Sequence, residues 1–277
     1  MTLRLGLIGG NITQTRSPAL HIACGLSIGR NVTYDLLIPQ EQGLDLPAML
    51  ARCEKSGFAG VNVTYPFKET VIGEAQAGDL IVADMGSSNT ICFTATGKRA
   101  FNTDYTGFVA AFRAHYGNTP PGRVLVLGAG GVGRAVVFGL AALGATGIQL
   151  YDTDAPKVEA LITAVGHAFP DVAATKAGAS DLHALEDFDG AVNCTPLGMA
   201  GKPGSPLPAG ATGSLRWAFD AVYTPEHTLF REQTGKLGAD FLSGWDLYFH
   251  QGIHAFELFS GVAPDVEWVR RVITHRP

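Results

Sequence analysis

Glycines cluster where an apolar run gives way to an Ala/Val-rich segment. Residues 123–135 read Arg-Val-Leu-Val-Leu-Gly-Ala-Gly-Gly-Val-Gly-Arg-Ala. Gly128 permits a tight turn out of a strand, Gly130 lets the backbone approach a pyrophosphate, and Gly133 lets the next helix pack near the strand. That helix presents free N–H groups and a partial positive charge to phosphates. The spacing predicts a dinucleotide site; a glycine-rich turn of another α/β protein is the alternative. The predicted contacts are Gly128, Ala129, Gly130, Gly131, Val132 and Gly133.

An acidic residue follows these glycines at the distance that a ribose contact requires. Asp152 comes after the next predicted strand, roughly 20 residues past the glycines, where a carboxylate can accept from the adenosine ribose 2′-OH. The same charge would repel a 2′-phosphate, and Lys157 is the first basic residue after Tyr151. The sequence therefore favours NAD, with NADP as the second option because Arg134 is a candidate compensating cation.

A second group of polar residues lies in the first third of the chain. Residues 60–69 read Gly-Val-Asn-Val-Thr-Tyr-Pro-Phe-Lys-Glu. Asn62 and Thr64 are two apart, so in a strand they point to the same face. Pro66 ends that strand and Lys68 follows on the turn, which predicts an amine at the mouth of a cleft. Asp104 precedes a predicted helix, and a simple N-cap is the alternative to a chemical role.

The elements that must position these residues alternate between strands and helices. The length of 277 residues exceeds one typical domain and predicts two. Pro120-Pro121-Gly122 is the clearest internal turn, and a linker helix over 105–116 precedes it. Predicted strands are 3–8, 33–38, 60–64, 90–93, 124–127, 148–151, 190–193 and 217–222. The Ala/Leu-rich pieces between the first four strands are predicted to be helical, and the further predicted helices are 132–143, 156–168, 247–260 and 264–273.

Composition argues against several classes of function. The net charge of −5 and the lack of a Lys/Arg cluster predict no nucleic-acid partner. The first residues do not read as a signal peptide, and no apolar run approaches the roughly 20 residues that span a bilayer. Four scattered cysteines predict reduced thiols in a soluble, cytoplasmic protein. His250 and His254 are four apart without a third ligand nearby, so no metal site is predicted.

Eight motifs, taken together and in order, resemble the shikimate/quinate dehydrogenases. They extend from one end of the chain to the other and comprise residues 15–21, 62–68, 88–90, 102–104, 128–135, 193–199, 220–225 and 250–252. The resemblance implies an α/β protein of two lobes, an N-terminal α/β substrate domain and a Rossmann-type dinucleotide-binding domain, with a cleft between them. The substrate domain would comprise 1–104, completed by C-terminal helices in 245–277, and the nucleotide domain 105–244.

The resemblance also implies a reaction and the residues for it. The family interconverts shikimate and 3-dehydroshikimate, and quinate and 3-dehydroquinate, by hydride transfer to NAD or NADP. Lys68 and Asp104 would form the catalytic pair, and Thr15 and Ser17 would hold the substrate carboxylate. The remaining substrate contacts would be Asn62, Thr64, Asn89, Tyr223 and Gln251; Asn193, Thr195, Pro196, Met199, Val222 and Gly244 would contact the cofactor.

Three segments differ from those of the commonest biosynthetic shikimate dehydrogenase, and they indicate which branch of the family the chain resembles. Thr15 replaces the first serine of a Ser-x-Ser pair, Tyr151-Asp152-Thr153-Asp154 replaces an Asn-Arg-Thr clamp for the 2′-phosphate, and Gly244-Trp-Asp-Leu replaces Gly-x-x-Met. These departures place the chain nearer the NAD-using quinate/shikimate or shikimate dehydrogenase-like branches. The alternatives are a dehydrogenase of an amino-substituted analogue and a catalytically silent nucleotide-binding regulator, against which the Lys68/Asp104 pair argues. A monomer or homodimer is expected.

Overall fold

The chain folds into two compact units. The computed structural model describes residues 2–10, 12–13 and 15–274. The first unit comprises residues 1–107 and 249–277, and the second comprises residues 108–248. The changes from one unit to the other fall within α4 (Thr103–Tyr116) and α8 (Gly244–Ser260).

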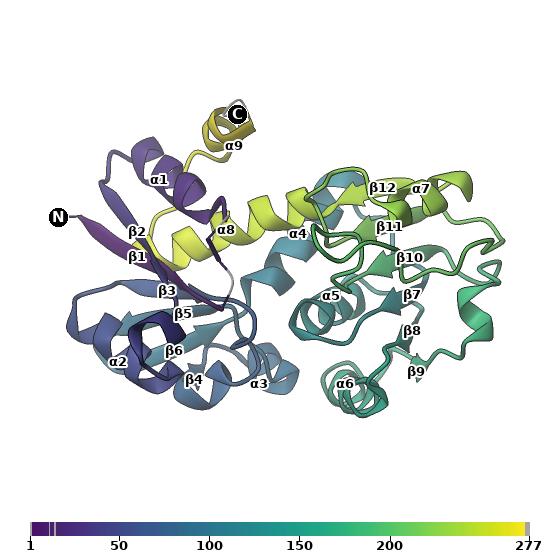
Figure 1. Cartoon of the computed structure of the whole chain (residues 1–277), viewed down its shortest axis with the longest axis horizontal. Helices are drawn as coiled ribbons and strands as arrows, with labels where there is room; N and C mark the ends of the chain where they lie inside the picture. Colours follow the sequence, from purple (N-terminus) through teal and green to yellow (C-terminus); the bar gives the residue numbers. More distant parts are fainter. Residues whose placement is uncertain (1, 11, 14, 275–277) are drawn as a thin grey trace. The chain divides into compact units, whose positions relative to one another are not determined.

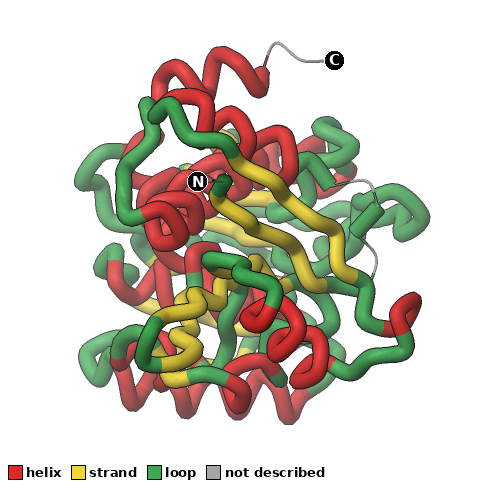
Figure 2. Tube along the Cα trace, turned by 90° about the vertical axis from the view of Figure 1, so that its left-hand side faces the viewer, coloured by secondary structure: helices red, strands yellow, loops and turns green. Residues whose placement is uncertain are grey.

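The first unit contains a mixed sheet of six strands in the order β2-β1-β3-β5-β6-β4. Strand β1 lies between β2 and β3 and runs parallel to both, whereas β5 is antiparallel to β3 and β6. Figure 2 shows strands of this unit in yellow beside helices in red. The strands are β1 (Leu3–Ile8), β2 (Val32–Leu37), β3 (Gly60–Val63), β4 (Gln76–Ala77), β5 (Thr90–Thr94) and β6 (Gly97–Phe101). The helices wholly within this unit are α1 (Ser17–Ser27), α2 (Leu46–Lys55), α3 (Leu80–Met85) and α9 (Val266–Thr274).

Local capping and apolar burial explain these elements. The Asp45 carboxylate accepts from the Ala48 N–H at 2.9 Å and so begins α2, while Asp79 does the same for Val82 at 2.8 Å in α3. The core between α2 and the sheet buries Met49, Leu50, Val61 and Ile91 completely. Strand β3, which leads to Lys68, is therefore fixed by packing.

The second unit contains a fully parallel sheet in the order β12-β11-β10-β7-β8-β9, which can be followed from top to bottom in Figure 1. Its elements are β7 (Arg123–Leu127), α5 (Gly131–Ala142), β8 (Gly147–Tyr151), α6 (Ala155–Ala168), β9 (Ala174–Lys176), β10 (Gly190–Asn193), β11 (Trp217–Asp220), α7 (Leu229–Lys236) and β12 (Asp240–Ser243). The chain leaves β7 toward β8 on one side and later returns to β10 on the other. In such sheets the point of reversal is where ligands bind, beyond the carboxyl ends of the strands.

The predicted α/β class is confirmed, but several local predictions are wrong or incomplete. Asp104 does not cap α4, because Asn102 Oδ1 accepts from the Tyr105 N–H at 3.1 Å and Asp104 lies in the first turn. Helix α8 begins at Gly244 rather than residue 247. Strands β4, β6, β9 and β12 and helix α7 were not predicted, since they are short and carry polar residues.

Candidate active site

A lysine and an aspartate form a close ion pair in the first unit. Lys68 Nζ donates to Asp104 Oδ2 at 2.7 Å, and the two side chains are only 14% and 8% exposed. The Lys68 carbonyl accepts from the Ser88 N–H at 2.8 Å, which ties the turn after β3 to the segment before β5. Because Asn102 caps α4, the Asp104 carboxylate is available to the ammonium. Two residues that are 36 positions apart thus form one unit able to exchange protons.

The residues predicted to hold a carboxylate are joined to a partly buried tyrosine that the sequence reasoning missed. Thr15 Oγ1 donates to Ser17 Oγ at 3.0 Å, and the Ser17 hydroxyl bonds to that of Tyr34. The Tyr34 hydroxyl donates to Asn62 Oδ1 at 2.9 Å, and burial raises the pKa of Tyr34. Its ring stacks on that of His21 at 4.7 Å; burial lowers the pKa of His21 to about 3, so this imidazole is neutral. No spacing rule points to Tyr34, which is an ordinary residue of β2.

The polar connection continues toward the residues predicted to bind ring hydroxyls. Asn62 Nδ2 donates to Thr90 Oγ1 at 3.1 Å, and Thr90 Oγ1 donates to Asn89 Oδ1 at 2.9 Å. Asn89 Oδ1 also accepts from the Thr103 N–H at 2.7 Å, while its Nδ2 lies 3.5 Å from Gln251 Oε1. The structure thus brings Asn62, Asn89 and Gln251 into one group, although they come from three distant parts of the chain.

Two further predicted substrate residues lie outside this hydrogen-bonded group. Thr64 follows β3, where its N–H donates to the Ile8 carbonyl at 2.9 Å. Its methyl occupies the space beside Gly9, since a Cβ at Gly9 would come within 2.5 Å of it. Tyr223 belongs to the second unit, where its ring stacks on that of Tyr248 at 5.3 Å.

The glycine turn after β7 fits a phosphate-bearing ligand. Gly128 has φ of +105°, and a Cβ there would come within 2.9 Å of the Cys194 and Thr195 backbone, so this turn touches the loop after β10. A Cβ at Gly133 would overlap the Gly128 carbonyl oxygen. At Gly130 a Cβ would meet no atom within 4 Å, and no side chain caps α5 there. The start of α5 is therefore packed on one side and open on the other, as a pyrophosphate requires.

Asp152 stands beside this turn, as expected from its position after β8. Its Oδ2 accepts from the Ala129 N–H at 2.7 Å, and its Oδ1 accepts from the Asp154 N–H at 2.9 Å. The carboxylate is thus held in a fixed orientation at the glycine turn. The predicted neighbours Gly131 and Val132 open α5 and are partly exposed.

Gly130→Ala tests the open space at the start of α5. Gly130 has φ of −75°, which alanine adopts readily, so we expect the melting temperature of the free protein to change by less than about 2 °C. We expect affinity for NADH, measured by fluorescence titration, to fall about tenfold or more because the methyl occupies the room for the pyrophosphate. Gly166→Ala, in an equally open position on α6, is the control. Unchanged affinity in Gly130→Ala would contradict the assignment.

The other predicted cofactor residues cluster at the carboxyl ends of β10 and β11. Asn193 Oδ1 accepts from the Thr195 N–H at 2.9 Å and from the Thr195 hydroxyl at 2.7 Å. Pro196 and Met199 are exposed on the same loop, Met199 at 41%. Val222 follows β11, and Gly244 begins α8 where a Cβ would come within 2.5 Å of the Asp220 carbonyl oxygen.

A buried carboxyl group that the sequence reasoning missed lies among these residues. Asp220 ends β11 with no exposed surface and accepts hydrogen bonds from Asn193, the Val222 N–H and Thr228. Burial raises the pKa of Asp220 from 3.8 to about 6, although these hydrogen bonds lower it in part. Two signals in the sequence point to it: Asp220 ends an apolar strand and opens the family motif at 220–225, although no role was assigned to it.

The raised pKa predicts how Asp220 affects stability. The carboxyl binds its proton more tightly in the folded chain than in the unfolded chain. Its contribution to stability is therefore greatest below about pH 4 and is lost as pH rises through about 6. Asp220→Asn does not titrate, so its free energy of unfolding relative to the unmodified protein should rise by up to about 3 kcal/mol from pH 4 to pH 7. Urea unfolding at several pH values measures this, and a constant difference would contradict it.

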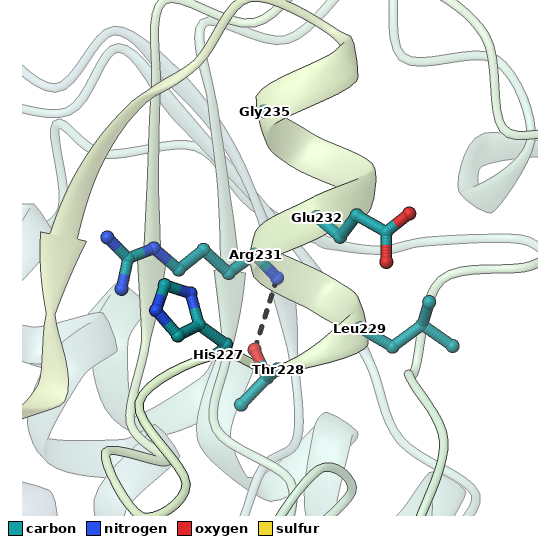
Figure 3. Close-up of a pocket in the computed structure, with 6 residues that line it drawn as sticks. All are labelled: His227, Thr228, Leu229, Arg231, Glu232 and Gly235. Atoms are coloured by element: carbon teal, nitrogen blue, oxygen red, sulfur yellow. Dashed lines mark hydrogen bonds between the residues drawn. The ribbon is translucent and has the colours of Figure 1, made fainter.

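A separate hollow of about 470 Å³ runs along the start of α7 (Figure 3). It is lined by His227, Thr228, Leu229, Arg231, Glu232 and Gly235. No residue predicted for the site lines it. Among the residues that the structure describes, no three His, Cys, Asp or Glu side chains are grouped as metal ligands. The described helices include none that is long and apolar enough to cross a bilayer.

Comparison with known proteins agrees with this arrangement. Residues 7–91 match the family model of the shikimate dehydrogenase substrate binding domain. The NAD(+) quinate/shikimate dehydrogenase of Corynebacterium efficiens is 34% identical over 274 residues, which cover 97% of this chain and 96% of that protein.

Solved structures of quinate and shikimate dehydrogenases are also similar to this chain along its length. A quinate dehydrogenase from Corynebacterium glutamicum in complex with NAD matches with a TM-score of 0.90 and 32% identity over 99% of both chains. A shikimate 5-dehydrogenase from Thermus thermophilus in complex with NADP(H) and shikimate matches with a TM-score of 0.85 and 29% identity over 98% of both chains. With similarity along its whole length and the resemblance predicted from its motifs confirmed, this chain belongs to the shikimate/quinate dehydrogenase family.

Proposed function

We propose that this protein oxidises a ring hydroxyl of shikimate, and of quinate, with NAD, and catalyses the reverse reduction. The observation that carries the proposal is the Lys68–Asp104 pair at 2.7 Å within the same unit as the connected polar group from Thr15 to Gln251. The second unit supplies the glycine turn and Asp152, which suit a dinucleotide.

The polar group of the first unit suits a polyhydroxylated acid. Thr15 and Ser17 are only partly buried, and their hydroxyls, which here bond to each other and to Tyr34, can rotate to donate to the carboxylate. Asn89 and Gln251 offer amide donors and acceptors for ring hydroxyls, and Thr64 supplies another hydroxyl. Asn62 supports this set from β3, and Tyr223 is assigned to the substrate from family resemblance.

The Lys68–Asp104 pair supplies the proton transfer. During oxidation the pair takes the hydroxyl proton of the substrate, and during reduction it returns a proton to the developing alkoxide. Asp104 holds Lys68 Nζ in one orientation through their hydrogen bond. When bound, the nicotinamide dinucleotide accepts or donates the hydride. Asn193, Thr195, Pro196, Met199, Val222 and Gly244 are assigned to its nicotinamide side.

NAD is proposed as the preferred cofactor, with NADP used less well. The Asp152 carboxylate, fixed at the glycine turn, accepts from a free ribose 2′-OH and repels a 2′-phosphate.

Initial rates of NAD and NADP reduction with shikimate and, separately, with quinate test the proposal. Faster reduction of NAD supports the role of Asp152, and the better acid identifies the preferred substrate. No turnover with either acid and either cofactor would reject the proposed substrates. It would favour an amino-substituted analogue, or a silent nucleotide-binding regulator if dinucleotide binding persists.

Two broader expectations go with this function. The described cysteines are all free, and Cys24, Cys53 and Cys92 are buried, which supports a reducing compartment such as the cytoplasm. The proposed partners are small molecules, without nucleic acid or membrane, and sedimentation would distinguish the expected monomer from a homodimer.

A further inference from the structure

Asp220 links three neighbouring segments of the second unit. It is paired in register with Asn193 at the ends of the adjacent parallel strands β11 and β10. Its Oδ1 accepts from Asn193 Nδ2 and from the Val222 N–H, each at 2.9 Å. Its Oδ2 accepts from Thr228 Oγ1 at 2.6 Å, and Thr228 in turn accepts from the Arg231 N–H and caps α7 (Figure 3).

This arrangement determines which way the Asn193 amide faces. A carboxylate only accepts hydrogen bonds, so Asn193 must turn its NH₂ toward Asp220 and its carbonyl oxygen away. That oxygen then accepts from both the N–H and the hydroxyl of Thr195, at 2.9 and 2.7 Å. The NH₂ also donates to the Leu197 carbonyl at 3.1 Å. The orientation of one amide thus shapes the loop over residues 194–197.

We propose that Asp220 is a positioning residue that holds the loop after β10 and the turn after β11 in the form that the nicotinamide half of the cofactor requires. Because Asp220 is fully buried, it acts through Asn193 and Val222 and not by contact with the ligand. The assignment of these loops to the nicotinamide rests on the proposed function. The ordering of the loops by Asp220 is independent of that function, because it follows from the hydrogen bonds alone.

Two substitutions separate the hydrogen-bonding role of Asp220 from simple filling of space. Asp220→Asn keeps one oxygen for Asn193 and Val222, and its NH₂ can turn toward Thr228, whose hydroxyl can accept. Asp220→Leu keeps the same branched skeleton, with two bulkier methyl groups in place of the two oxygens, and removes every acceptor. Phe230→Leu, at a fully buried position of α7 in the same unit, is the matched control for lost stability.

Hydrogen exchange of the ligand-free protein tests the loop order directly. The N–H groups of Thr195, Leu197 and Val222 are all bonded within this arrangement. In Asp220→Leu their exchange should be about tenfold faster or more, while exchange in the glycine turn at 128–133 stays unchanged. Asp220→Asn and Phe230→Leu should exchange at these groups as the unmodified protein does. Equal exchange in all four proteins would overturn the proposal.

Binding of NADH and of ADP then tests the link to the cofactor. ADP carries the half assigned to the glycine turn and Asp152 but lacks the nicotinamide. Asp220→Leu should weaken NADH binding about tenfold and ADP binding less than twofold, a split that general destabilisation would not produce. The proposal would be overturned if Asp220→Leu weakened the binding of NADH and ADP equally. It would also be overturned if Asp220→Asn weakened NADH binding as much as Asp220→Leu. Faster exchange in Asp220→Leu, with no NADH or NADPH binding by the unmodified protein, would retain the loop ordering and reject the proposed function.

Discussion

Lys68→Ala should lower kcat for shikimate oxidation by about 10²- to 10⁴-fold, the range that a positioned proton-transfer group contributes. The reason is that Lys68 Nζ is bonded to Asp104 at 2.7 Å, and alanine leaves neither an amine nor a carrier for the proton. Affinity for NADH should stay within about twofold, since Lys68 and the glycine turn belong to different units. Steady-state rates and NADH titration together measure this outcome.

Two companion variants make the result specific. Lys98→Ala removes a lysine from the same unit that lies 3.9 Å from Glu54, and it should leave kcat unchanged. Lys68→Ala also leaves the Asp104 carboxyl buried without its partner, so melting temperatures are recorded and rates are measured well below them. Asp104→Asn keeps an acceptor for Lys68 but removes the charge, and it should also slow turnover. A folded Lys68→Ala protein that keeps more than a tenth of the activity would refute the proton-transfer role.

Asp152→Asn should shift the ratio of kcat/KM for NAD to that for NADP toward NADP by about 10- to 100-fold. A unit charge about 4 Å away is worth roughly 1 kcal/mol in water and 4 kcal/mol near a protein surface, enough for a change of that size. The asparagine can still accept from the Ala129 N–H, which Asp152 Oδ2 now does at 2.7 Å, so the glycine turn should keep its shape.

The measurement is kcat/KM for each cofactor at saturating shikimate. Asp171→Asn removes an exposed charge from the same unit and is the control for a change in net charge alone. If the ratio in Asp152→Asn equals that of the control, cofactor choice is set by groups other than this carboxylate.

The sequence predicted those elements whose burial is complete. Strands β7 and β10 have both faces covered, so they appear as short apolar runs whose ends are nearly unambiguous. Strand β12 begins with an exposed aspartate at the edge of its sheet, and β9 has only three residues, so neither carries a readable period. Asn102 and Asp104 are equally good caps by type, and only the geometry shows that Asn102 accepts the bond.

Some residues of the site were likewise identified from the sequence, and others were not. The Lys68–Asp104 pair was identified as a pair because family motifs mark both residues, but its 2.7 Å contact depends on how the turn after β3 and the first turn of α4 fold. Tyr34 and Asp220 were missed because each is a single polar residue whose partners, Asn62 and Asn193, lie 28 and 27 positions away. No local pattern encodes such partners.

The first unit is built from two separate stretches of the chain, and this affects the order in which the units can fold during synthesis. Residues 1–107 leave the ribosome first, but the unit also needs residues from 249 onward, which are made after the whole second unit. Phe256 and Phe259 lie 6.2 and 5.9 Å from the His21 ring, and Gln251 meets Asn89, so the late segment fills both the core and the polar group. Since domains fold as units, residues 108–248 are the first able to complete a fold during translation. Lys68 is made early, yet the fold that surrounds it is finished last.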